Sequence, residues 1–141
     1  MDARPTRDQS EVDQALALRE RVFCGEQGVS LAAERDGRDA DATHVVVVEG
    51  GRVIGTARLL LGRRVVRLSR LAVDPAFRRR GVARAVLESA ERCAREVAAT
   101  RITLHAQIPA TALYEGAGYR ERGERFIEEG IEHVVMEKAL A

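Results

Sequence analysis

One short run of the chain passes from a strand through a turn into a helix: Leu71-Ala72-Val73-Asp74-Pro75-Ala76-Phe77-Arg78-Arg79-Arg80-Gly81-Val82-Ala83-Arg84. Asp74-Pro75 ends the apolar strand, because proline has no backbone N–H to give to a sheet. The first N–H groups of the following helix lack backbone partners, and the helix dipole is positive there. Gly81 and Ala83 are small enough to let a pyrophosphate approach these groups. The run therefore predicts a phosphate-binding turn.

Arginine is concentrated around this turn, although the net charge of the whole chain is only +1. Between positions 63 and 84 the single acidic residue is Asp74, whereas the basic residues are Arg63, Arg64, Arg67, Arg70, Arg78, Arg79, Arg80 and Arg84. All basic residues except Lys138 are arginine, so composition explains the choice of arginine over lysine. Composition does not explain the clustering, which indicates a local anion site.

Upstream of the turn, the sequence predicts one helix followed by three antiparallel strands. The helix is expected to begin at Ser10, with Asp13 completing an S-x-x-D capping box. Gly25 and Gly28 break the helical pattern into a loop or a short second helix. Residues 33–41 are charged, and nothing in them demands regular structure. The predicted strands are His44–Glu49, Arg52–Leu61 and Val65–Val73.

The third of these strands changes its facing along its length. Its apolar residues occupy even positions at Val66 and Leu68, then odd positions at Leu71 and Val73. A strand keeps one face buried only if this parity is constant. The switch therefore predicts a β-bulge near Ser69-Arg70.

Downstream, the pattern alternates between helices and strands. A long helix is predicted from about Gly81 to Ala98, with a buried face formed by Val82, Val86, Ala90, Cys93 and Val97. A buried strand covers Arg101–Gln107, and a further helix is opened by Pro109 and closed by Gly118. Two last strands lie near Tyr119–Phe126 and Ile131–Ala139. The expected fold is α+β (mixed α/β): one domain, residues 1–141, with a twisted, mostly antiparallel sheet of six to seven strands flanked by about four helices.

Several classes of protein are disfavoured by composition. No apolar run approaches the roughly 20 residues of a membrane span, and the polar N-terminus lacks an apolar signal region, so a cytoplasmic protein is expected. Cys24 and Cys93 lie far apart and are expected to be free thiols. His44, His105 and His133 lack metal-ligand spacing, so no metal is expected.

Several motifs together resemble one enzyme family. The R-x-x-G-x-A spacing from Arg78 to Ala83 resembles the acetyl-coenzyme A signature of the GNAT acetyltransferase superfamily, and Tyr114 stands before a glycine-aromatic pair as in that family. A narrower similarity links the chain to small bacterial ElaA-like GNAT proteins. It rests on residues 19–29, Thr43-His44, His105-Ala106-Gln107 and Gly130-Ile131-Glu132-His133.

The resemblance implies an acyltransferase that uses acetyl-coenzyme A as cosubstrate. The backbone of Leu71, Ala72 and Val73 would pair with the pantetheine arm as an added strand would. The pyrophosphate would lie on the turn formed by Arg78, Arg79, Arg80, Gly81, Val82, Ala83 and Arg84. Gln107, where many family members carry asparagine, would hydrogen-bond the pantetheine. Coenzyme A carries roughly four negative charges, which accounts for the arginine cluster.

The resemblance also implies catalytic roles for direct attack of an amine on the thioester in a ternary complex. Leu71 N–H would stabilise the oxyanion, and Tyr114 would protonate the leaving thiolate, although a buried packing role fits Tyr114 too. Glu26 is the candidate base, acting directly or through water, and an exposed or capping carboxylate is its alternative reading. His105 and His133 are further candidate bases, because imidazole titrates in the useful range.

Other functions remain open at this point. A coenzyme A-binding regulatory or interaction module could have the same fold without efficient catalysis. A nucleic-acid binder would need stacking aromatics near the arginines, and only Phe77 is there, so no nucleic-acid partner is expected. A nucleotide phosphotransferase would need a G-x-x-x-x-G-K-[ST] loop, which is absent. The expected partner is a small-molecule or peptide amine; no membrane partner is expected, and exposed edge strands would suit a homodimer.

Overall fold

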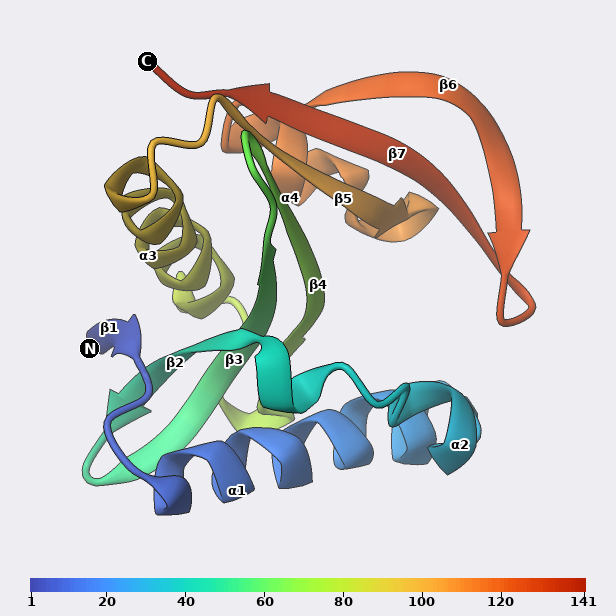
Figure 1. The fold of residues 1–141 in the computed structure, drawn as a ribbon. Helices are drawn as coiled ribbons and strands as arrows, with labels where there is room; N and C mark the ends of the chain where they lie inside the picture. Colours follow the sequence, from blue (N-terminus) through green and yellow to red (C-terminus); the bar gives the residue numbers. More distant parts are fainter.

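The computed structural model describes residues 1–141 and builds them around one seven-stranded sheet in the order β1-β2-β3-β4-β5-β7-β6 (Figure 1). All neighbouring strands are antiparallel except β4 and β5. The strands are β1 (Asp2–Pro5), β2 (Thr43–Glu49), β3 (Arg52–Leu61), β4 (Val65–Val73), β5 (Arg101–Gln107), β6 (Arg120–Glu128) and β7 (Ile131–Ala139). The predicted mostly antiparallel sheet is confirmed.

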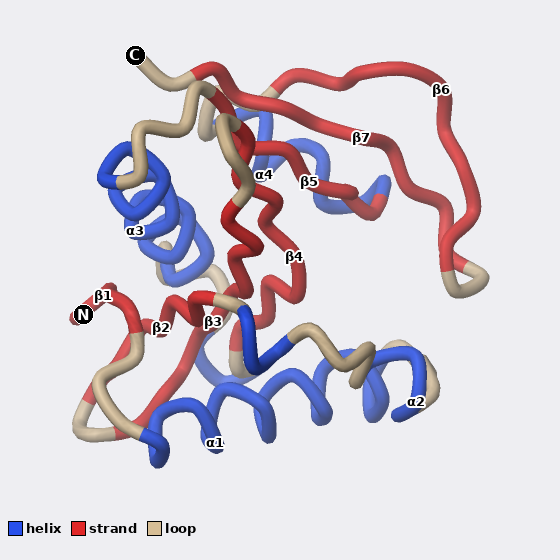
Figure 2. The backbone as a smooth tube through the Cα atoms, viewed as in Figure 1, coloured by secondary structure: helices blue, strands red, loops and turns tan.

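Four α-helices accompany the sheet (Figure 2). They are α1 (Gln9–Arg19), α2 (Leu31–Glu34), α3 (Val82–Glu96) and α4 (Thr111–Gly116). A π-helix at Glu20–Glu26 continues α1, and short 3-10 turns lie at Asp39–Asp41, Pro75–Phe77 and Ile108–Ala110. None of the helices combines the length and the apolar character that crossing a membrane would require.

The valine run of β2 separates two hydrophobic cores. Successive residues of a strand point to opposite faces. Val45 and Val47 accordingly lie in the large core beneath α3, whereas Val46 packs with Ala15 and Leu18 of α1 in a smaller core. The two helices thus cover opposite faces of the same strands, which explains why β2 is apolar on both sides.

The helix after the predicted phosphate turn packs very closely on the sheet. Val82, Val86 and Ala90 are fully buried, as expected. A Cβ at Gly55 on β3 would lie 2.5 Å from Val82 Cγ1, so only glycine admits the helix at this depth. Val97 was wrongly expected on the buried face: the helix ends at Glu96, and Val97 is 43% exposed.

The N-terminal region differs from expectation in three ways. The cap of α1 is Asp8, whose side chain accepts a hydrogen bond from Glu11 N–H, so the helix begins at Gln9 and not at Ser10. Helical structure continues through Gly25 as a π-helix before the chain turns at Gly28. Strand β1 was not predicted; it is a short edge strand, paired only with β2.

The C-terminal third follows the predicted order. Strand β5 has the expected bounds, and Gly118 closes the region of α4 with a φ of 97°. Pro109 lies in a 3-10 turn, and the α-helix itself begins at Thr111.

Candidate active site

Strand β4 carries the predicted bulge. Arg58 of β3 pairs with Ser69 and Thr56 pairs with Ala72, so two residues of β4, Arg70 and Leu71, lie opposite a single residue of β3. Arg70 has a φ of 58°, a left-handed conformation that residues other than glycine seldom adopt. The extra residue disrupts the ladder locally and leaves backbone groups available beside it.

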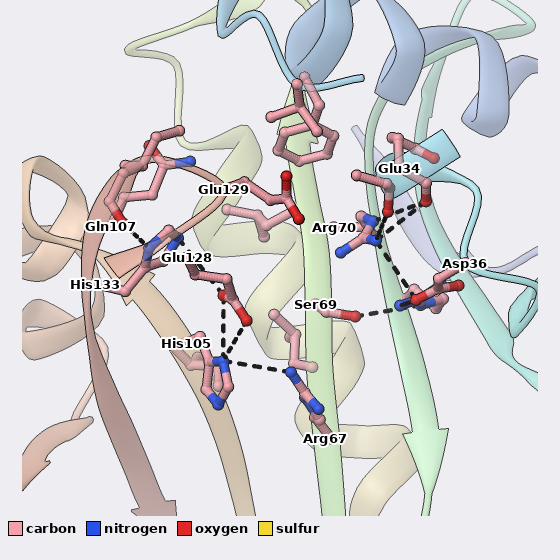
Figure 3. A pocket seen from close by; sticks show the side chains of 18 of the residues that line it. Glu34, Asp36, Arg67, Ser69, Arg70, His105, Gln107, Glu128, Glu129 and His133 are labelled. Carbon is pink, nitrogen blue, oxygen red and sulfur yellow. Dashed lines mark hydrogen bonds and ion pairs between the residues drawn. The ribbon is translucent and has the colours of Figure 1, made fainter. Parts of the chain in front are cut away.

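Beyond the bulge, β4 and β5 separate. They are paired only from Val65–Arg101 to Leu68–Leu104, after which β5 continues along β7. A pocket of about 380 Å³ opens here, which we call the β4–β5 pocket (Figure 3). Five sequence-predicted site residues from four elements line it: Leu71, His105, Gln107, Tyr114 and His133.

The predicted phosphate turn lies between the end of β4 and the start of α3. Arg79 and Gly81 have φ values of 62° and 79°, and a Cβ at Gly81 would meet no atom within 4 Å. The turn is fixed from below by Asp74, whose Oδ1 accepts a hydrogen bond from Ala76 N–H at 3.0 Å. Ala85 N–H donates to Gly81 O, so the N–H groups just before it form the open first turn of the helix.

The arginines of this turn are not equivalent. The side chain of Arg79 makes no hydrogen bond or ion pair, and Arg80 lies over the Phe77 ring at 5.4 Å. Arg78, in contrast, donates to both oxygens of Glu26, at 2.9 and 2.8 Å. The predicted base and a predicted phosphate ligand are thus paired with each other, and Glu26 does not line the β4–β5 pocket.

Tyr114 is the buried phenol of the pocket. Tyr114 is 6% exposed, and burial raises the pKa of its hydroxyl to about 12. The hydroxyl is therefore protonated at neutral pH and is chemically able to donate a proton to a strong base such as a thiolate.

A cluster of two histidines and a glutamate forms the β5–β7 wall of the pocket. His105 Nδ1 lies 3.3 Å from both oxygens of Glu128, and His133 Nε2 lies 3.9 Å from Glu128 Oε2. Phe126 stacks on the His133 ring. His133 Nδ1 lies 2.7 Å from the carbonyl oxygen of Ile131, which can only accept, so Nδ1 carries the proton and neutral His133 keeps a lone pair on Nε2.

The opposite wall is held by ion pairs that join carboxylates of residues 34–39 to Arg19 and Arg58. Glu34 is 1% exposed and accepts hydrogen bonds from the equally buried Arg19 at 2.6 and 3.0 Å. Arg58 donates to both oxygens of Asp36, and these bonds lower the pKa of that carboxyl. Residues 33–41, in which the sequence demanded no regular structure, contain the end of α2 and a 3-10 turn, and buried arginines of the sheet and α1 pair with their carboxylates.

Glu128 and Glu129 were not among the residues expected at the site. Figure 3 shows Glu128 between His105 and His133, and Glu129 on the side toward Arg70. Their only signal was position, since they precede Gly130 at the turn from β6 into β7. The pairing of His105 with Val135 and of Gln107 with His133 across β5 and β7 then brings the turn to the pocket.

Comparison with known proteins gives a consistent result. The family model described as "Acetyltransferase (GNAT) domain" matches residues 6–140. The uncharacterized N-acetyltransferase YjcF of Bacillus subtilis is 30% identical over 139 residues, covering 98% of this chain and 99% of the relative. An acyl-CoA N-acyltransferase from Pseudomonas aeruginosa superposes with a TM-score of 0.87 at 27% identity, covering 99% of this chain and 100% of that one. Escherichia coli ElaA superposes with a TM-score of 0.84 at 23% identity, covering 97% and 98% of the two chains.

Proposed function

Because the chain belongs to the GNAT acetyltransferase family, we propose that it transfers the acetyl group of acetyl-coenzyme A directly to a primary amine bound in the same complex. The observation that supports this most is that the bulge, the β4–β5 pocket and the phosphate turn follow one another along the single strand β4. The bulge at Arg70 opens the β4–β5 pocket, and the same strand leads into the turn at Gly81.

The residues present suit the cosubstrate. The turn offers open first-turn N–H groups, open space at Gly81, and the side chains of Arg79 and Arg80, which have no acidic partners; these features suit a pyrophosphate. The backbone of Leu71 to Val73 would receive the pantetheine arm. Gln107, whose Nε2 donates to Gln27 Oε1 at 2.8 Å, would exchange that partner for the pantetheine amide.

The chemical step needs three groups from the protein. The amine nitrogen attacks the thioester carbonyl, a C–N bond forms, and the C–S bond breaks as coenzyme A leaves. Leu71 N–H would stabilise the oxyanion, and Tyr114 would give its proton to the leaving thiolate.

The contacts favour one of the candidates for the base that takes the proton of the amine. His133 Nε2 has a free lone pair on the pocket wall, whereas both oxygens of Glu26 are bound by Arg78. We therefore favour His133 over Glu26.

Calorimetric titration of acetyl-coenzyme A tests the cosubstrate site. Gly81→Glu puts bulk and negative charge where the pyrophosphate would lie, so binding is expected in the wild type and lost in this variant. Gly123→Glu is the matched control, since Gly123 also has a positive φ, of 78°, and open space, but lies on β6. Absence of binding by folded wild-type protein would overturn the proposal. Binding without coenzyme A release for any amine would instead indicate the regulatory module.

A further inference from the structure

Charges of both signs face the β4–β5 pocket without partners of their own. Arg58, Arg70, Glu34 and Asp36 also line it, but each already has a partner. Arg58 pairs with Asp36, Glu34 accepts from Arg19, and Arg70 donates to the carbonyl oxygen of Glu34. The side chains of Glu129 and Arg38 line it too, and neither makes a hydrogen bond or an ion pair. Glu129 and Arg38 therefore give the pocket one free carboxylate and one free guanidinium, in addition to the charges of Arg67 and Glu128.

Arg67 and Glu128 compete for a single atom. His105 Nδ1 lies 3.4 Å from Arg67 Nη2 and 3.3 Å from the Glu128 oxygens. This nitrogen either donates to Glu128, which leaves Arg67 without an acceptor, or accepts from Arg67, which leaves Glu128 without a donor. Neither side chain has another partner apart from His133 near Glu128. A half-buried charge left without a partner is unfavourable, so the pair is suited to a ligand that supplies the missing partner.

Arg67 is too far from the phosphate turn to serve the cosubstrate. Val73 lies six positions further along β4, which corresponds to roughly 20 Å of strand. It lies on the other side of Leu71 from the turn, on the same face of the sheet as Ser69. In Figure 3 it lies beside His105, away from Glu129.

We infer that the acceptor amine carries a second, anionic group, which Arg67 binds while Glu128 keeps the hydrogen bond from His105 and the unpartnered carboxylate of Glu129 faces the ammonium end. Arg38 lies on the same pocket and can assist at the anion. This inference rests on the proposed function and narrows it to amines bearing a carboxylate or a phosphate. Leu71 and Arg67 are four residues apart, about 13 Å of strand, so the two charges of the acceptor stand several bonds apart.

Steady-state acetylation of a panel of amines tests the inference, with release of coenzyme A as the readout. The panel contains glycine, 4-aminobutyrate and 6-aminohexanoate, the carboxamide of each, 3-aminopropyl phosphate and 1,4-diaminobutane. Wild-type protein is expected to show a lower KM for the longer amino carboxylates or for the amino phosphate than for the neutral amides. Preference between carboxylate and phosphate identifies the anion.

Three variants separate the anion site from a general effect. Arg67→Gln is expected to raise the KM of the preferred anionic acceptor about tenfold to hundredfold, which is the effect of losing a charged hydrogen bond. In this variant, the ratio of the KM of the preferred anionic acceptor to the KM of the matching carboxamide should approach one. Arg67→Lys should restore part of the preference, because the charge is kept. Arg63→Gln is the matched control: Arg63 lies at the far end of β4, in the exposed turn before it.

Failure of the inference and failure of the proposed function give different results. If wild-type protein binds acetyl-coenzyme A and acetylates amides or diaminobutane as well as the anionic amines, the inference is wrong and the function stands. A selectivity for anions that Arg67→Gln does not alter also overturns it. If acetyl-coenzyme A does not bind, the proposed function fails first.

Discussion

Replacing Glu34 by glutamine should destabilise the protein more than any exposed charge change. Glu34 and Arg19 are both essentially inaccessible to water, and the carboxylate accepts two hydrogen bonds from the guanidinium. Breaking one partner of a buried pair costs about 3–5 kcal/mol, because the other charge stays buried. Arg19 retains Asp39 at 2.7 Å, so we expect the lower end, about 3 kcal/mol.

Urea denaturation measures this effect directly. With a slope of about 2 kcal/mol per molar urea, the transition midpoint of Glu34→Gln should fall by about 1.5 M. Glu20→Gln is the control, since Glu20 contacts Arg35 at 3.5 Å on the surface and should change stability by less than about 0.5 kcal/mol. Equal midpoints for the two variants would refute the reasoning, because Asp39 alone would then suffice to pair Arg19.

Two further changes test other parts of the structure. Glu11→Gln should weaken the acid dependence of stability. Hydrogen bonds from Arg4, then from Arg7 N–H, lower the pKa of Glu11 to about 2 from an ordinary 4.5. The stabilisation by the Glu11 carboxylate is therefore complete above about pH 4.5 and is lost as the pH falls toward 2. The difference in Tm between wild type and variant should therefore shrink over that interval, and a difference independent of pH would contradict the assignment. Tyr114→Phe should lower kcat about 100-fold while calorimetric binding of acetyl-coenzyme A is unchanged, and an unaltered kcat would exclude Tyr114 as the acid.

The central part of the fold was predictable because its signals are local. The parity change in β4 is visible between Leu68 and Leu71, and a bulge lets both sets of apolar residues face the same side of the sheet. The turn at Asp74-Pro75 and the apolar face of α3 also depend on neighbours in sequence. The error at the first helix has the same origin: Asp8 and Ser10 are both good caps, and the sequence alone does not separate them.

The walls of the candidate site were not predictable, because they depend on contacts between distant residues. Glu34 meets Arg19 fifteen positions away, and Glu128 meets His105 twenty-three positions away. No local pattern distinguishes these carboxylates from solvated ones such as Glu124. Glu26 shows the same difficulty, since its pairing with Arg78 spans 52 positions.

The segment of residues 34–39 and its partner Arg58 are linked to two residues of β4 at the bulge, Ser69 and Arg70. Arg70, at the bulge, donates to the carbonyl oxygens of Ala33 and Glu34, and Arg58 Nε donates to Ser69 Oγ at 3.2 Å. Burial, followed by the neighbouring Arg58 charge, lowers the pKa of Arg70, so the carbonyl contacts help this cation to remain in place. Because Leu71 follows directly, the position of the candidate oxyanion donor depends on the packing of a segment that looks like a charged loop in the sequence. That dependence gives residues 34–39 a role in the geometry of the site as well as in stability.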